Sequence, residues 1–93
     1  MRIWKGRIVT KYVEVAYLDA FWYKGHDPYK VPRHNIRKVT GWLLEEDDDV
    51  IILGIDLPET DGADFTVVGI PKATVLAIDV LKEIKVPRPE DYF

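Results

Sequence analysis

The sequence predicts an all-β protein, folded as a small, strongly bent, five-stranded open barrel with an enlarged loop between the first two core strands. Apolar segments that alternate or are rich in β-branched residues recur along the chain, and turn-forming residues separate them. No segment is convincingly helical. With 93 residues the chain has room for one domain with a modest core, which we place at residues 1–86, followed by a C-terminal tail at residues 87–93.

The first predicted strand lies within Ile3–Tyr17, where Val13–Tyr17 alternates as a half-buried strand does. Upstream, Met1–Lys5 is either a short strand leading into Gly6 or a frayed end. A helix is disfavoured there because Gly6 and β-branched residues follow.

A long loop is predicted at Phe21–Lys38, because Gly25, Pro28 and Pro32 exclude a helix of useful length. Aromatic rings interleaved with cations suit single-stranded nucleic acid, since bases stack on rings and Lys or Arg meets phosphate. In the alternative, the aromatics plug the open end of the barrel. The candidate nucleic-acid-binding residues are Trp22, Tyr23, Tyr29, Arg33, His34, Arg37, Lys38 and, beyond the loop, Lys72.

The central element is a hairpin over Val39–Gly54, whose two apolar arms enclose the acidic run Glu45–Asp49. Five neighbouring carboxylates cannot be buried unpaired, so the turn is expected in water. They could instead gather a divalent cation, although the run lacks the spaced ligands and turn glycine of a calcium loop.

The next predicted strand, Phe65–Ile70, follows a polar loop over Pro58–Asp64 and ends near Pro71, which cannot donate to a ladder. Thr74–Leu81 fits a strand better than a helix because half of its residues are β-branched. The tail ends in two aromatics and either docks on this or a neighbouring subunit or frays.

An open five-stranded barrel leaves two apolar edges that invite aggregation unless they are covered. Pairing of edges between subunits would cover them, and head-to-tail pairing usually closes a ring, here of about five to seven subunits. The predicted interface residues are Thr66, Val67, Val68, Val75, Leu76 and Ile78.

The composition argues against an enzyme, because the chain has no Cys, no Ser, no glycine-rich phosphate loop and no convincing His-carboxylate pair. We expect no cofactor and no metal, and we treat His26, Asp27 and His34 as surface residues because they lack ligand spacing. No apolar run approaches the roughly 18 residues of a membrane span, which predicts a cytoplasmic protein without membrane contact. The absence of Ser and Gln, together with a single Asn and a single Met, indicates a hot environment, or chance in a short chain.

The net charge of −3 hides an uneven distribution along the chain. Residues 1–43 hold nine Lys/Arg against three Asp/Glu, whereas residues 44–93 hold four against thirteen. A basic patch is therefore compatible with the acidic total, but a wholly basic nucleic-acid-binding domain is not.

Three segments resemble the motifs of the Sm-like family. A V-x-V-x-L strand with a following acid, then G-x-L-x-x-x-D and an apolar strand, has its counterpart in Val13, Val15, Tyr17, Asp19, Gly41, Leu43, Asp47, Val50, Ile52 and Leu53. The second motif resembles residues 68–75, and YLDAF, GWLLEEDDD and IPK look like small Sm-like proteins of viral or phage origin. The resemblance covers residues 12–81.

The resemblance implies a ring-forming, non-enzymatic barrel that binds RNA or acts as a scaffold, with a pocket unlike that of uridine-reading relatives. The family's Asn and Arg positions look like Ile51 and Pro71 here, its stacking position falls near Asp49, and Lys72 is the nearby cation. The alternative is a virus-encoded or phage-encoded protein-interaction module that uses strand edges and the C-terminal tail to bind a protein partner.

Overall fold

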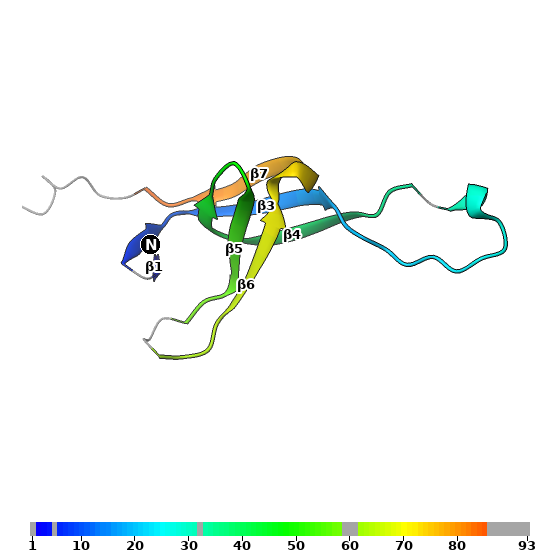
Figure 1. Ribbon diagram of the computed structural model, residues 1–93. Coiled ribbons are helices and arrows are strands. Elements are labelled where there is room, and N and C mark those ends of the chain that lie inside the picture. The colour runs from blue at the N-terminus through cyan, green and yellow to red at the C-terminus, as the bar shows by residue number, and fades with distance from the viewer. Residues whose placement is uncertain (1, 5, 32, 59–61, 86–93) are drawn as a thin grey trace, which may run out of the picture.

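The computed structural model describes residues 2–4, 6–31, 33–58 and 62–85, and the all-β prediction is confirmed there (Figure 1). The strands are β1 (Arg2–Trp4), β2 (Arg7–Val9), β3 (Lys11–Leu18), β4 (Ile36–Glu46), β5 (Val50–Asp56), β6 (Thr66–Pro71) and β7 (Val75–Glu83). Two short 3-10 turns, η1 (Pro28–Lys30) and η2 (Lys72–Thr74), are the helical elements of this part of the chain. The predicted tail at residues 87–93 lies outside the described residues.

Five strands form one antiparallel sheet in the order β6-β5-β4-β3-β7, and β1 pairs with β2 in a separate hairpin. The five core strands are as predicted. The sheet bends but does not close into a barrel, since β6 and β7 lie at its two margins and are not paired with each other in the described residues.

The bend is made within β4, the longest strand. Its residues Ile36–Trp42 pair with β3, and residues Trp42–Glu46 pair with β5 across a bulge, so Trp42 is the residue at which the partner changes. Figure 1 shows β5 and β6 crossing β3 and β4 as a result. At this corner a methyl group on Gly41 would lie 2.8 Å from the Gly54 carbonyl oxygen, so only glycine permits the approach.

The core lies inside the fold of the sheet. Its fully buried side chains are Val13 and Val15 of β3, Ile51 and Leu53 of β5, and Ile70 of β6. Half-buried apolar residues pack around them, namely Tyr17, Val39, Leu43, Val68 and Val75. The alternation predicted over Val13–Tyr17 is therefore the alternation between this core and the outer face.

One predicted boundary was wrong, and one open alternative is decided. Arg2–Trp4 forms β1, as in the short-strand alternative for Met1–Lys5, and the alternating strand predicted within Ile3–Tyr17 is β3, which begins after the β1–β2 hairpin and Thr10. The long loop ends at Asn35, whereas it was predicted to continue to Lys38: Arg37 and Lys38 pair with Tyr17 and Ala16 of β3. The hydrogen-bonded ladder between β3 and β4 therefore extends further into the predicted loop than the positions of the turn-forming residues indicate.

The C-terminal part follows the prediction. Residues Val75–Glu83 form a strand and not a helix, and Pro71 is the last residue of β6. Asp47, Asp48 and Asp49 form the turn between β4 and β5, and Glu45 and Glu46 are the last residues of β4; all five are exposed. Within the described ranges, no helix is both long and apolar enough to cross a membrane.

The corner at Gly41 gives a direct test of this fold. We expect Gly41→Ala to lower the free energy of unfolding by about 1–3 kcal/mol, because the added methyl group must push two backbones apart. Equilibrium denaturation at matched protein concentrations measures this change. Gly69→Ala is the control, since its methyl group would lie 3.7 Å from Val50 Cγ2, an ordinary contact. Equal effects of the two substitutions would contradict the close approach.

Candidate functional site

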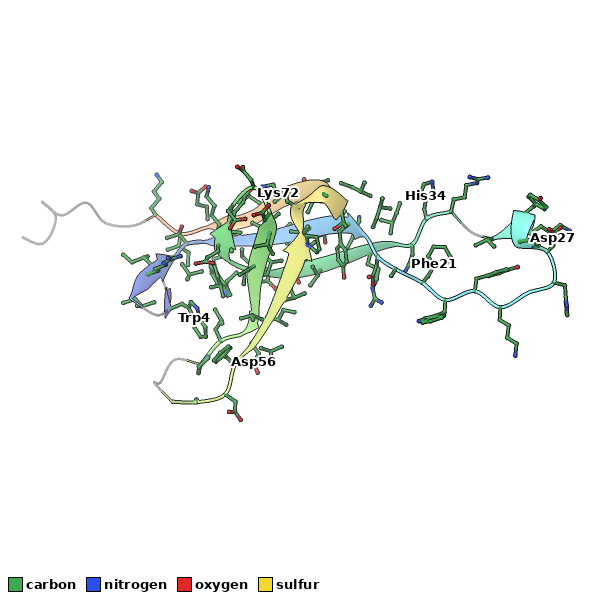
Figure 2. The ribbon with its side chains drawn as sticks, viewed as in Figure 1. Trp4, Phe21, Asp27, His34, Asp56 and Lys72 are labelled. Atoms are coloured by element: carbon green, nitrogen blue, oxygen red, sulfur yellow. The ribbon has the colours of Figure 1, made fainter. Side chains whose placement is uncertain are left out.

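The long loop, residues 19–35, is tied together at its base and at its tip. At the base the Asp19 N–H donates to the Asn35 carbonyl (2.8 Å), and the Asn35 side-chain amide donates to the Ala20 carbonyl (3.2 Å). At the tip Asp27 caps η1, since its carboxylate accepts from the Tyr29 N–H at 2.9 Å. Figure 2 shows the loop extending away from the sheet, with Phe21 and His34 on its two arms and Asp27 near its end.

The aromatic residues of the loop face solvent. Trp22 and Tyr29 are essentially fully exposed, and Phe21 and Tyr23 are exposed over 40% and 47% of their surface. The alternative in which they plug the end of a barrel is therefore wrong for a single copy. Exposed rings on a projecting arm are costly in water unless a partner uses them, and base stacking is one such use.

The cations near these rings fall into two groups. Lys24, Lys30 and Arg33 are exposed and make no ion pair within the described part of the chain. On β4, Arg37 lies 3.7 Å from Asp19 and Lys38 lies 3.8 Å from Glu14, and in both pairs the cation is exposed and the acid half-buried. Solvent-accessible pairs of this kind contribute little to stability, so these two cations can exchange their partners for phosphate at small cost.

Lys72 does not lie near this loop. It lies over the sheet, away from His34 and Asp27 in Figure 2, and its ammonium group forms an ion pair with Glu46. The backbone N–H of Lys72 donates to the Asp49 carbonyl at 2.8 Å, which joins η2 to the β4–β5 turn. The predicted nucleic-acid-binding residues therefore form one group at the loop, and Lys72 lies apart from them in an ion pair with Glu46.

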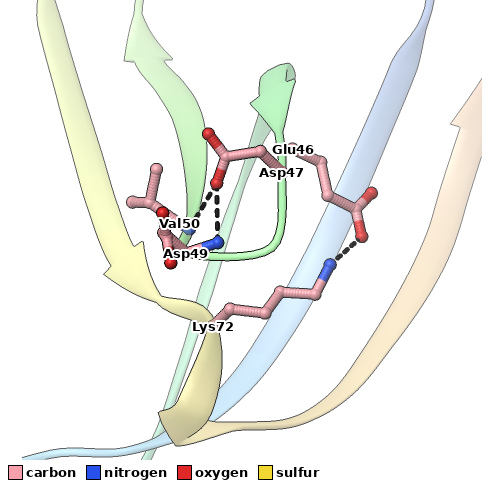
Figure 3. Close-up of polar contacts among 5 residues, drawn as sticks. All are labelled: Glu46, Asp47, Asp49, Val50 and Lys72. Atoms are coloured by element: carbon pink, nitrogen blue, oxygen red, sulfur yellow. Dashed lines mark hydrogen bonds and ion pairs between the residues drawn. The ribbon is translucent and has the colours of Figure 1, made fainter.

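The acidic turn organises its own backbone. Asp47 Oδ1 accepts from the N–H groups of Asp49 (2.7 Å) and Val50 (2.8 Å), drawn in Figure 3. These donors, Val50 first, hold the pKa of the Asp47 carboxyl below its ordinary value. Among the described residues, no group of three or more His, Cys, Asp or Glu side chains is arranged to hold a metal ion.

The predicted interface residues lie on the two margins of the sheet. Thr66 and Val67 on β6 and Leu76 and Ile78 on β7 are exposed. Val68 and Val75 are half-buried because they also pack against the core. Val80 and Leu81, which are not among the predicted interface residues, extend the exposed apolar surface of β7. Their position in a predominantly apolar edge strand could have predicted this.

A second group that sequence reasoning missed lies on the outer face of the sheet. The ring centroids of Trp4 and Phe65 are 4.8 Å apart in an edge-to-face contact, and Arg7 Nη1 lies 2.8 Å from Glu45 Oε1. These contacts hold the β1–β2 hairpin over β4, β5 and β6 beside a cavity of about 330 Å³. Residues 4 and 65 are too far apart in the chain for sequence spacing to reveal the contact.

The acidic turn yields a pH prediction. Because the folded-state pKa of Asp47 is lowered, its carboxylate stabilises the fold above the unfolded-state pKa, and this contribution is lost as the pH falls through the folded-state pKa. We expect Asp47→Ala to reduce stability at neutral pH, and the difference from the parent protein to vanish in acid. Denaturant unfolding across a pH series measures it.

Asp48→Ala is the matched control, since no hydrogen bond to the Asp48 carboxylate is present in the described residues. It removes the same charge from the same turn without removing a backbone contact. An equal, pH-dependent loss in both variants would show that net charge, and not the Asp47 hydrogen bonds, stabilises the turn.

No protein-family model, curated protein or solved structure matches this chain. The Sm-like resemblance therefore rests on the motif residues of the sequence, and the family assignment is a proposal.

Proposed function

We propose that this chain is a non-enzymatic, Sm-like subunit of a homo-oligomeric ring that binds single-stranded RNA through its long loop. The observation that carries the proposal is the pair of exposed apolar margins, β6 and β7, on one bent sheet. The segments that resemble the two family motifs fold as β3, β4 and β5 and as β6, η2 and β7, which is consistent with the resemblance.

Strand β7 supports the ring most strongly. Ile78 pairs with Val15 and Val80 pairs with Val13, so these side chains share the core face of the sheet. Yet Val13 and Val15 are buried, whereas Ile78 and Val80 are 37% and 53% exposed. The apolar core surface thus continues to an edge where nothing in the described chain covers it. A second copy would complete it.

The two margins differ in sequence, which favours head-to-tail pairing of β6 in one copy with β7 in the next. Such heterologous contacts form a closed ring when the rotation between subunits closes. In the proposed assembly, of about five to seven subunits, every edge is covered and every copy projects one loop.

The loop supports the choice of RNA. It presents the exposed rings of Trp22 and Tyr29, with Tyr23 beside them, and the three cations Lys24, Lys30 and Arg33. His34, Arg37 and Lys38 lie at the arm that returns to the sheet. Lys72 is outside the proposed contact surface because Glu46 already neutralises it, and the aspartates beside it repel phosphate.

The same β7 margin also supports a second candidate, a protein-interaction module of viral or phage type. An exposed edge accepts a strand from any partner by β-augmentation. The two candidates differ in what covers the edge: a second copy of this chain or a different protein.

If the protein forms the proposed ring, it should have a defined number of subunits, and a charge placed on an edge strand should prevent assembly. We expect the parent protein to have a single mass of several subunits in native mass spectrometry. Val67→Lys on β6 and Leu76→Lys on β7 should each prevent ring closure, because a lysine on an edge strand opposes pairing. A mixture of the two variants should form dimers, since one intact β6 edge and one intact β7 edge remain.

Ile36→Lys serves as the control, because Ile36 is exposed and apolar but lies on an interior strand. It should leave the assembly unchanged. A monomeric parent protein would refute the ring, and a monomer that binds a foreign strand would favour the second candidate.

RNA binding is tested separately by electrophoretic titration with single-stranded RNA. Trp22→Ala and Tyr29→Ala should each weaken binding by about 5- to 150-fold, the usual effect of losing one stacked base. Lys30→Gln with Arg33→Gln should reduce the slope of log affinity against log salt by about 1.4.

Lys11→Gln, a charge loss outside the loop, should change affinity little. An intact ring that does not bind RNA at low salt would exclude the RNA role and leave the assembly standing.

A further inference from the structure

A cavity of about 330 Å³ lies between the β1–β2 hairpin and the outer face of the main sheet. Its apolar lining comes from four elements or their flanks: Trp4, Leu44, Ile52, Phe65 and Val67. Phe65 and Val67 are exposed, and Trp4, Leu44 and Ile52 are half-buried. Apolar walls of this kind favour an apolar or aromatic occupant.

The rim of this cavity, which we call the hairpin pocket, is polar. Arg7 and Glu45 lie there as an ion pair with exposed side chains. The hairpin itself has three residues in each strand, and a two-stranded hairpin of that size is marginal without further packing. A segment or ligand that contacted both Trp4 and the main sheet would therefore stabilise the β1–β2 hairpin.

We propose that the hairpin pocket is the docking site of this chain's own C-terminal segment, residues 86–93, with Tyr92 and Phe93 as its anchors. The exit of β7 supports this, because the Ile84 N–H donates to the Thr10 carbonyl at 2.8 Å. Ile84, two residues before this segment, thus lies beside Thr10, the residue that links β2 to β3.

The distance to be covered is short. Arg7, on the rim, precedes Thr10 by three residues, about 10 Å along an extended chain. Eight extended residues span at most about 29 Å. The anchors at positions 92 and 93 can therefore reach the pocket from Lys85 without moving the sheet.

The chemistry of the two parts is complementary. The segment carries two acids, Glu90 and Asp91, directly before its two aromatic residues. Residues 1–13 hold four Lys/Arg and no acid. Aromatic side chains in the pocket would bury their rings against Leu44 and Ile52, while the acids remain at the rim near Arg7. This inference concerns one copy and does not depend on the ring.

The tryptophan side chains provide the first test. In the full chain with Tyr92→Ala and Phe93→Ala, the indole N–H resonance of Trp4 should shift in two-dimensional NMR spectra. Trp22, on the long loop, is the internal control and should not move. An unchanged Trp4 resonance would overturn the proposal, and the two substitutions change no residue of the five-stranded sheet, so loss of folding does not confuse the result.

The absence of native cysteine allows a second test by disulfide trapping. We expect Glu45→Cys with Asp91→Cys to form an intramolecular disulfide about tenfold faster than the control pair Ile36→Cys with Asp91→Cys, because docking raises the local concentration of the two thiols. Glu45 and Ile36 are both exposed, but Ile36 lies outside the pocket.

Each outcome is decisive. Fast formation within one chain supports docking in the same copy. A disulfide could instead join position 45 of one copy to position 91 of another copy. Such dimers would assign the pocket to a neighbouring copy's segment and overturn the proposal as stated. Equal rates for the two pairs would mean that the segment does not occupy the pocket.

Discussion

The close approach of two backbones at one corner determines the shape of this molecule. Gly41 faces the Gly54 carbonyl, and the Leu57 side chain lies against Gly54, where it leaves no room for a larger residue. Because β4 changes its partner from β3 to β5 at this corner, β5 and β6 are turned over β3 and β4. One strand thus serves both halves of the sheet, and the enclosed core follows from that geometry.

The same geometry explains why few apolar side chains are fully buried and why many others are exposed. Folding a five-stranded sheet once encloses the inner face of β3, β5 and part of β6, but it leaves β7 outside the fold. Only Val75, at the start of β7, is half-buried, although six of its nine residues are apolar. The margins and the projecting loop are therefore where apolar and aromatic surface remains available to a partner.

The sequence predicted the parts of the fold that depend on local pattern. The alternation at Val13–Tyr17, the acidic turn and the strand character of Val75–Leu81 could all be predicted, because each arises from neighbouring residues. The break at Thr10 could not, since Ile8, Val9 and Thr10 are all β-branched and only pairing partners separate β2 from β3. Gly41 occupies an ordinary position in an alternating strand pattern, and only the fold shows that it forms the corner.

The candidate sites divide in the same way. The loop that carries Trp22 and Tyr29 could be predicted from Gly25, Pro28 and Pro32, whereas the exposure of these two rings and the pairing of Lys72 with Glu46 could not. That ion pair exists because η2 lies against the β4–β5 turn, a contact between segments 26 residues apart. The hairpin pocket likewise needs Trp4 and Phe65 to meet across the folded sheet.

The position of β3 between β4 and β7 has a consequence for biosynthesis. Lys11 pairs with Glu83, so one side of an early strand stays without its partner until β7 has left the ribosome. Until then the nascent chain presents the open edge of Val13 and Val15 to its surroundings. A chaperone, or the matching edge of another nascent copy, meets this protein first at β3, a strand that the finished fold conceals.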